Sequence, residues 1–299
     1  MSVAIIAEYN PFHNGHKFQI EEAKKRWPNE KIIVFMSGDY VQRGEISILP
    51  IEERSTIAKK FGVDEVIIMP FEVSTQAAHI FCEGAIKMVN NHNIDKLFFG
   101  SESNDPELLL NIANSIYSDI DQYNLLIKKN LKGGNSFPKA TCLALNELTG
   151  QSFEMPNDIL GLEYCKAIVK HNFPINVYTL KRSIGFHDQE TKDNFASASL
   201  IRKMIYDGED VSQFIPYKID YKNIRNIRSR YPEFQNIVRN SSPEELRNIK
   251  LISEGMENLF KKHIEAGSYN EFISLTNSKR YTSSRIQRVM LYVLLDVKK

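Results

Sequence analysis

Short apolar runs alternate with helical patterns through the first hundred residues, and this alternation limits the folds open to the chain. Four apolar runs have the length of β-strands, and three segments between them space their apolar residues as an amphipathic helix does. The predicted strands are residues 3–7, 31–36, 65–69 and 96–99, and the predicted helices are residues 15–27, 51–61 and 75–91. Strands joined by helices through short connections form a parallel sheet with helices on both faces.

The pattern becomes mainly helical after residue 104. Helical segments are predicted near 106–119, 138–148 and 159–170, and residues 175–180 form one more buried strand. From about residue 211 onward the sequence contains helical segments and no clear strand. We therefore predict an α/β domain with a Rossmann-like parallel sheet in residues 1–210, followed by a mainly helical region in residues 211–299.

The first predicted strand ends in a turn that carries two histidines. The sequence His13-Asn14-Gly15-His16 follows the strand directly, and a helical pattern begins at once. A helix N-terminus offers unpaired backbone N–H groups and the positive end of the helix dipole, which together favour an anion such as phosphate. Gly15 leaves room for a ligand to approach the backbone, and the imidazoles add donors whose charge can change near neutral pH. The turn therefore predicts a nucleotide-phosphate site.

Two other interpretations of these histidines remain open. They could be metal ligands, although histidine ligands on a helix are usually four residues apart and no Cys/His cluster follows. They could also do no more than cap the turn and the helix. We predict no metal-ligating residue.

Other stretches should reach the same edge of the sheet, because the C-terminal ends of parallel strands lie together and ligands bind there. Arg43 stands in a loop between glycines, Gly100 follows the fourth strand, and Arg182 follows the fifth. A later helix start contains Ser199 and, one turn on, Arg202, which can bind phosphate through hydroxyl, N–H and guanidinium groups. Similar residues also occur in ordinary turns and helix caps.

Net charge differs between the two parts of the chain. Residues 211–299 contain 16 Lys and Arg against 9 Asp and Glu, whereas residues 1–210 contain 22 against 28. In one basic stretch, 221–230, Arg225 and Arg228 would lie one helical turn apart; in another, 279–288, a tyrosine and hydroxyl residues separate positive charges. This composition suits a polyanionic partner, and the second stretch suits a nucleic-acid backbone and an unstacked base. Solvated helix faces can look the same.

Cysteine usage and the N-terminus bear on location. Cys82, Cys142 and Cys165 are odd in number and form no CxxC, so neither a disulfide framework nor a zinc site is predicted. Met1 is followed directly by a strand, and no apolar run reaches membrane-spanning length. We expect a cytoplasmic protein with no membrane partner, and the sequence does not indicate its oligomeric state.

Two motifs resemble those of the nucleotidylyltransferase superfamily. The turn at residues 13–16 is similar to its HxGH signature, and residues 197–202 are similar to its second phosphate-contacting motif. More narrowly, the chain resembles the bacterial tRNA(Met) cytidine acetate ligase family. The similar stretches are residues 7–16, 36–45, 99–102, 157–161, 254–258 and 279–288.

This resemblance implies a reaction and its participants. The family makes acetylcytidine at the wobble position of elongator tRNA(Met) from acetate and ATP, by way of acetyl-adenylate. It implies ATP as the cofactor, with Mg²⁺ bound mainly through phosphates and water, and acetate and elongator tRNA(Met) as partners. We assign His13 and His16 to the α-phosphate as catalytic residues, and Arg182 and Arg202 to the leaving phosphates.

The motifs and the resemblance together predict two sets of binding residues. The predicted ATP-binding residues are Ala7, Glu8, Tyr9, Asn10, Pro11, Phe12, His13, Asn14, Gly15, His16, Gly100, Asn157, Arg182, Ser199 and Arg202. The predicted RNA-binding residues are Arg43, Lys279, Arg280, Arg285 and Arg288.

Two other functions share parts of the pattern. A nucleotidylyltransferase of small-molecule metabolism would carry the same motifs but would not need a basic C-terminal surface. A non-catalytic tRNA-binding protein could keep the nucleotide-binding fold without the reaction. ATP consumption that depends on acetate and tRNA would distinguish an acetate ligase from a small-molecule nucleotidylyltransferase. ATP–pyrophosphate exchange would distinguish an acetate ligase from a non-catalytic tRNA-binding protein.

Overall fold

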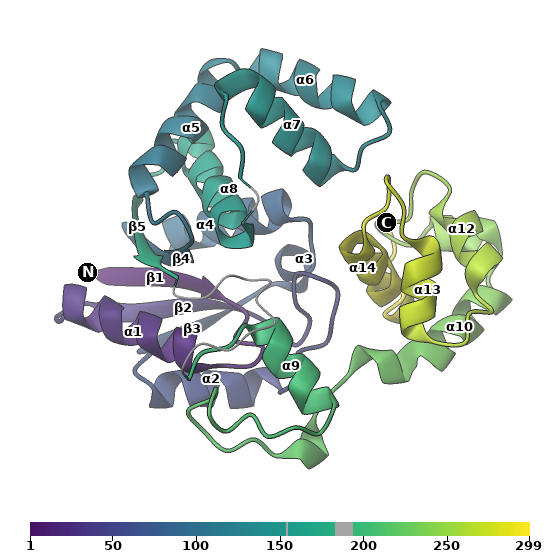
Figure 1. Ribbon diagram of the computed structural model, residues 1–299, viewed down its shortest axis with the longest axis horizontal. Helices are drawn as coiled ribbons and strands as arrows, with labels where there is room; N and C mark the ends of the chain where they lie inside the picture. The colour runs from purple at the N-terminus through teal and green to yellow at the C-terminus, as the bar shows by residue number, and fades with distance from the viewer. Residues whose placement is uncertain (154, 183–193) are drawn as a thin grey trace.

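A five-stranded parallel sheet organises the first part of the chain in this computed structural model, which describes residues 1–153, 155–182 and 194–299 (Figure 1). Its strands are β1 (Ser2–Ala7), β2 (Lys31–Ser37), β3 (Glu65–Met69), β4 (Lys96–Ser101) and β5 (Asn176–Lys181). They lie in the order β3-β2-β1-β4-β5, and each neighbouring pair is parallel. The prediction of a Rossmann-like α/β sheet is confirmed, and every strand begins and ends within two residues of its predicted range.

Helices cover both faces of the sheet, because successive side chains of each strand point to opposite sides. Along β1, Val3 and Ile5 pack into one core and Ala4 packs into the other. The Ala4 core is covered by α4 (Ala78–Asn91), α5 (Pro106–Ser118) and α8 (Pro156–His171), with α6 (Ile120–Lys132) and α7 (Phe137–Thr149) beyond them (Figure 1). The other core is covered by α1 (Asn14–Arg26), α2 (Ile51–Lys60) and α9 (Ala198–Tyr206).

The helix predicted at 75–91 is shorter than expected. A short helix, α3 (Phe71–Ser74), precedes it, and α4 begins only at Ala78. Between them, Thr75 donates from its hydroxyl to the carbonyl of Phe71, and the side chains of Thr75 and Gln76 bond to Tyr292. These side-chain contacts replace the helix that the apolar spacing alone would favour. The helix α6 has no counterpart in the sequence prediction.

The C-terminal helices pack around a core of their own. They are α10 (Tyr231–Asn240), α11 (Pro243–Arg247), α12 (Met256–His263), α13 (Tyr269–Thr276) and α14 (Ser283–Leu294). Phe234, Phe260 and Phe272 are fully buried at the centre of this core, with ring centroids 5.2 to 5.7 Å apart. Just after residue 210, by contrast, Val211 and Phe214 still pack into the core beneath the sheet.

The basic stretch at 221–230 is not the helix that its arginine spacing suggests. Two short 3₁₀ turns occur there, Tyr221–Asn223 and Ile227–Arg230, and Arg225 lies between them. Its guanidinium donates to the Asp39 carboxylate and to the Leu49 carbonyl, both at 2.8 Å. The prediction of Arg225 and Arg228 on one helical face is therefore wrong, because Arg225 fastens this segment to the sheet domain.

Helix α14 joins the C-terminal helices to the sheet domain. The Tyr292 hydroxyl lies 2.9 Å from Thr75 Oγ1 and accepts from Gln76 Nε2 at 3.1 Å. Gly44 comes so close that a Cβ there would lie 2.5 Å from the backbone nitrogen of Arg288. The loop after β2 is therefore pressed against the backbone of α14.

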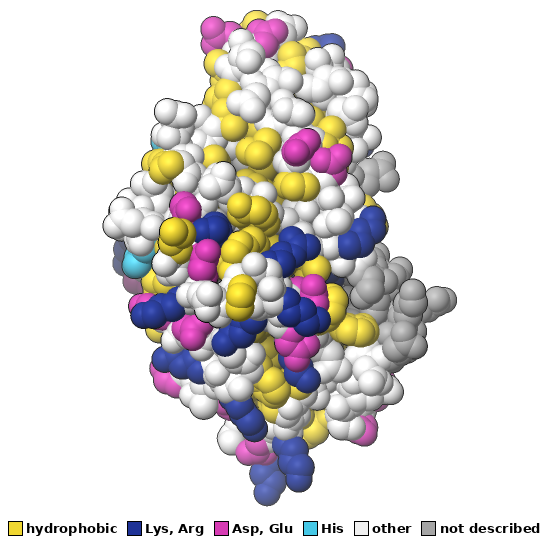
Figure 2. Space-filling view, turned by 90° about the vertical axis from the view of Figure 1, so that its left-hand side faces the viewer, with side chains coloured by type: hydrophobic (Ala, Val, Ile, Leu, Met, Phe, Trp, Pro, Cys, Tyr) yellow, Lys and Arg dark blue, Asp and Glu magenta, His cyan; other side chains and the backbone are white. Residues whose placement is uncertain are grey.

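Charged side chains of both signs are mixed on the side of the molecule that carries the N-terminus and the edge strand β5 (Figure 2). This mixture agrees with a formal net charge of +1. Among the described residues, no helix combines the length and apolar character needed to cross a membrane.

Candidate active site

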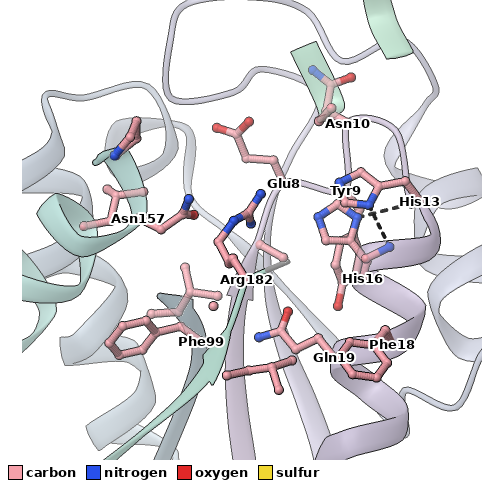
Figure 3. A pocket seen from close by; sticks show the side chains of 18 of the residues that line it. Glu8, Tyr9, Asn10, His13, His16, Phe18, Gln19, Phe99, Asn157 and Arg182 are labelled. Atoms are coloured by element: carbon pink, nitrogen blue, oxygen red, sulfur yellow. Dashed lines mark hydrogen bonds between the residues drawn. The ribbon is translucent and has the colours of Figure 1, made fainter. Parts of the chain in front are cut away.

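A cavity of about 280 Å³ opens where the C-terminal ends of β1, β4 and β5 meet (Figure 3). It lies beside β1, where the strand order reverses, as ligand sites in such sheets do. The predicted site residues that line it are Ala7, Glu8, Tyr9, Asn10, His13, Gly15, His16, Arg43, Gly100, Asn157 and Arg182. We call it the histidine cavity.

His13 and His16 form the junction between β1 and α1. His13 is the N-cap of α1, and its Nδ1 accepts from the backbone N–H of Gly15 at 3.1 Å. The Nδ1 of His16 accepts from the backbone N–H of His13 at 3.2 Å. The two rings are stacked with their centroids 3.6 Å apart. Because each Nδ1 is an acceptor, each neutral ring carries its proton on Nε2 and can donate it to a ligand.

Both rings are neutral in the absence of a ligand. Burial lowers the pKa of His13 to about 3, and the nearby Arg182 and Arg202 add to this effect. Burial, the His13 ring and Arg182 hold the pKa of His16 well below its usual value. The expectation that these charges change near neutral pH is therefore wrong for the ligand-free protein. A bound phosphate would favour the protonated rings, since an opposite charge raises the pKa of histidine.

Arg182 follows β5 and crosses over Gly100 at the end of β4. A Cβ at Gly100 would lie 3.3 Å from Cγ of Arg182, so glycine gives the arginine room. The Arg182 Nε lies 3.9 Å from Glu102 Oε1 and is buried without a hydrogen bond within the described part of the chain. Asn10 Nδ2 is likewise buried without a hydrogen bond among the described residues. Buried donors that lack an acceptor are costly unless a ligand provides one, so both atoms are candidates for phosphate binding.

The start of α8 and the loop after β4 fix each other in place. Glu102 accepts from the Asn157 side chain and from the backbone N–H of Asp158. In return, the buried Asp158 carboxylate accepts from the backbone N–H groups of Glu102 (3.1 Å) and Ser103 (2.9 Å). This network holds Asn157 at the cavity wall. Local sequence patterns predict no role for Glu102 or Asp158, and the one signal that could have found them is their position in the stretches that resemble the family, residues 99–102 and 157–161.

The Glu8 carboxylate enters the cavity from the end of β1 (Figure 3). One of its oxygens accepts from the backbone N–H of Gln42 at 2.9 Å, which ties the loop after β2 over the cavity. Behind it, the fully buried Arg54 of α2 donates to the carbonyls of Glu8, Ser37 and Leu49. Arg54 thereby fixes the ends of β1 and β2 relative to each other. Neither Gln42 nor Arg54 is singled out by the sequence.

Five predicted ATP-binding residues do not line the cavity as the structure describes it: Pro11, Phe12, Asn14, Ser199 and Arg202. Phe12 is buried and stacks on Phe61 with centroids 5.4 Å apart. The Asn14 side chain donates to the backbone carbonyls of Asn194 and Gln213, on either side of α9 in the sequence. Arg202 donates to the Asn10 carbonyl at 2.8 Å and lies 3.6 Å from Glu45. Phe12, Asn14 and Arg202 therefore hold the histidine turn in place without lining the cavity.

The predicted RNA-binding residues lie in separate places. Arg43 lines the histidine cavity. Arg280, Arg285 and Arg288 line a second cavity of about 490 Å³, between α7, α8 and the C-terminal helices. Lys279 lines neither cavity and donates to the Gly133 carbonyl at 3.3 Å.

Comparison with known proteins adds independent findings. A family model described as HIGH Nucleotidyl Transferase matches residues 1–299. The chain is 54% identical over 300 residues to the tRNA(Met) cytidine acetate ligase of Mycoplasma mobile, and the match covers 100% of both chains. It is 36% identical over 312 residues to the protein of that name from Listeria monocytogenes, across 99% of this chain and 80% of the other.

Solved structures agree with the sequence relatives. The apo crystal structure of Thermotoga maritima TmcAL matches with a TM-score of 0.90 at 30% identity, covering 100% of this chain and 76% of that one. The crystal structure of the same protein bound with alpha-thio ATP matches with a TM-score of 0.87 at 31% identity, with the same coverage.

Proposed function

The chain belongs to the HIGH nucleotidyl transferase family, among its tRNA(Met) cytidine acetate ligases, and from this premise we propose a two-step reaction at the histidine cavity. In the first step acetate and ATP give acetyl-adenylate and pyrophosphate. In the second step the acetyl group passes to the wobble cytidine of elongator tRNA(Met), and AMP leaves. A tRNA substrate agrees with the cytoplasmic location expected from the sequence.

The stacked pair of His13 and His16 supports this assignment most strongly. An acetate oxygen attacks the α-phosphorus in line, and negative charge builds on the phosphoryl oxygens and on the departing pyrophosphate. The two Nε2–H groups are fixed by the hydrogen bonds at Nδ1, so they can stabilise that charge without reorganisation. Arg182 and the Asn10 amide supply further buried donors on the other sides of the cavity.

Mg²⁺ fits this cavity as a companion of ATP. The described residues contain no group of three or more His, Cys, Asp and Glu side chains that could hold a metal, and Glu8 is the one carboxylate among those that line the cavity. Mg²⁺ commonly binds through one or two carboxylates together with substrate phosphates and water. It would supply positive charge to the leaving pyrophosphate.

The RNA would approach from the C-terminal helices, which carry the excess of positive charge. In the second step the cytidine N4 attacks the acetyl carbonyl carbon, and the bond from that carbon to the phosphate oxygen of AMP breaks. The loop that carries Gln42 and Arg43 lies between α14 and the histidine cavity, because Gln42 contacts both Glu8 and Arg288. We place the reacting base at this loop, with residues 1–210 binding ATP and residues 211–299 contributing to RNA binding.

One incubation tests the proposal. The protein is supplied with ATP, Mg²⁺, ¹⁴C-acetate and bulk tRNA, and the labelled RNA is digested to nucleosides. The expected product is one labelled acetylcytidine that comes from elongator tRNA(Met) and requires ATP. Omission of ATP, and replacement of tRNA by poly(A), are the controls.

Two outcomes would contradict the proposal. Transfer of AMP from ATP to a small phosphate-bearing acceptor, without use of acetate, would indicate a nucleotidylyltransferase of small-molecule metabolism. Tight binding of tRNA without acetate-dependent ATP–pyrophosphate exchange would indicate a non-catalytic RNA-binding protein.

A further inference from the structure

The second cavity, here called the arginine cavity, combines an apolar wall with cationic side chains. Phe137 at the start of α7 and Ile159 in α8 are exposed toward it, with 39% and 38% of their surface accessible. The ring of His79 packs against Phe137 with centroids 4.7 Å apart. Arg285 and Arg288 lie on the opposite side, from α14. An aromatic surface that faces arginines is typical of sites for single-stranded nucleic acid.

Arg288 is buried, yet none of the described acidic side chains forms an ion pair with it. Only 9% of this residue is exposed, and its hydrogen bond to the Gln42 carbonyl is long, at 3.4 Å. Burial lowers the pKa of Arg288 to about 10, and the positive charges of Arg285 and Arg43 add to this effect. No carboxylate in the described part of the chain forms an ion pair with it, whereas Arg285 pairs with Glu254 at 3.2 Å. A buried cation beside other cations is unfavourable unless an anion binds there.

The two cavities are separated by one layer of residues. Phe81 and Leu160 line the histidine cavity, and their chain neighbours Ile80 and Ile159 line the arginine cavity. At the edge of this layer, Gln42 donates from Nε2 to the Gln76 carbonyl at 2.9 Å and accepts from Arg288 through its own carbonyl. Arg288 therefore lies at the boundary between a cavity for a reacting base and a cavity with a partly exposed aromatic ring, that of Phe137.

We propose that the arginine cavity binds an unstacked base next to the reacting cytidine, with the phosphate that joins the two nucleotides on Arg288. This inference rests on the proposed function, because it assumes that the RNA enters the histidine cavity. The neighbouring base would lie on the exposed face of Phe137. The phosphate would supply the negative charge that Arg288 lacks.

The first test removes each contact from the protein. Phe137→Ala should raise the Kd of an elongator tRNA(Met) transcript about 5- to 150-fold, the range for one base stacked on one aromatic ring. Arg288→Met should raise the Kd as well and should reduce the slope of log Kd against log salt by about 0.7, the value for one phosphate contact in single-stranded nucleic acid. It should not lower the Tm, because methionine removes a buried charge that has no anionic partner among the described residues.

Matched controls come from the same molecule. Leu131 in α6 is as exposed as Phe137 and lines neither cavity, so Leu131→Ala should leave RNA binding unchanged. Arg239 in α10 forms a surface ion pair with Glu265 at 2.7 Å, so Arg239→Met should leave the salt slope unchanged.

The second test removes the base from the RNA. Each nucleotide that flanks the wobble cytidine is replaced in turn by an abasic residue. One of the two replacements should raise the Kd of the wild-type protein by about the factor seen for Phe137→Ala. Combined with Phe137→Ala, it should add nothing further, because both changes remove the same contact.

Several results would overturn the inference. It fails if the Kd is unchanged in either variant, if both abasic positions add fully to Phe137→Ala, or if Arg288→Met lowers the Tm and leaves the salt slope unchanged. Absence of any RNA acetylation by the wild-type protein would instead contradict the proposed function, so the two failures can be told apart.

Discussion

The imidazole rings of His13 and His16 are stacked 3.6 Å apart, and each ring accepts a backbone N–H group at Nδ1. One arrangement therefore caps α1 and orients two Nε2–H donors. The structural and the chemical interpretation of the two histidines do not exclude each other. The effect of a histidine substitution on the reaction rate can therefore be measured separately from its effect on the stability of the fold.

Replacement of His16 by alanine should remove one donor and leave the fold intact. We expect His16→Ala to slow acetate-dependent ATP–pyrophosphate exchange by about 10²- to 10³-fold, the usual loss for one donor to a charged transition state. The free energy of unfolding should fall by only about 1 kcal/mol, because a capping interaction is lost. Lys17→Ala, which removes an exposed ion pair with Glu21, is the control. Exchange near the wild-type rate in His16→Ala would refute the assignment.

Acid should destabilise the protein through the same histidines. Burial lowers the pKa of His13 to about 3 in the folded state, whereas a histidine in the unfolded chain titrates near its ordinary pKa of 6.5. Between about pH 6.5 and about pH 3 the unfolded chain binds more protons, so the free energy of unfolding falls as pH falls. The slope from one such group approaches about 1.4 kcal/mol per pH unit.

Urea unfolding at several pH values measures this slope. His13→Asn keeps a side-chain acceptor for the cap but cannot titrate, so its slope below pH 6.5 should be smaller than that of the wild type. Equal slopes would show that His13 is accessible to protons in the folded protein.

The sequence contains enough information to predict the sheet and the turn after β1. Apolar runs such as that of β2 are long enough to identify strands, and the HxGH turn identifies the edge of the sheet where the histidine cavity opens. The sequence does not reveal which residues of a motif face the cavity. Phe12 lies inside the same motif as His13, yet it packs on Phe61 rather than on the cavity.

The sequence could not predict the contacts between segments that lie far apart along the chain. Asp158 reaches the loop at Ser103, and Arg288 reaches Gln42 across 246 residues of sequence. No local pattern encodes such pairs, because they depend on how whole elements pack. The basic stretch around Arg225 shows the same limit, since its charge is used within the protein to bind Asp39.

Loss of Arg54 should destabilise the end of β1. Arg54 is fully buried and donates to the carbonyls of Glu8, Ser37 and Leu49. Arg54→Met leaves the carbonyls of Glu8, Ser37 and Gly38 without this donor, whereas the Leu49 carbonyl keeps its hydrogen bonds from Ser47 and Arg225. At about 1–3 kcal/mol for each unpaired acceptor, we expect a loss of at least about 3 kcal/mol by urea unfolding. The matched change on the exposed side of α2, Lys59→Met, should change stability by less than about 0.5 kcal/mol. A similar small loss in both variants would contradict the structure at this position.

Gly44 allows a direct test of how α14 docks on the sheet domain. Its φ is +78°, and a Cβ would lie 2.5 Å from the backbone nitrogen of Arg288, an atom that cannot move without its helix. Gly134 also has a φ of +78°, but a Cβ there would meet nothing within 4 Å. Gly134→Ala therefore measures the backbone strain alone, about 1–2 kcal/mol. Gly44→Ala measures the same strain together with displacement of α14.

We expect Gly44→Ala to lose more stability than Gly134→Ala in urea unfolding. It should also raise the KM for tRNA severalfold, because Arg288 and the loop at Gln42 would no longer be held together. The KM for tRNA should stay at the wild-type value in Gly134→Ala. Equal losses of stability, with no change in the KM for tRNA, would mean that α14 does not press on this loop in solution, and the route of the RNA between the two cavities would then have to be abandoned.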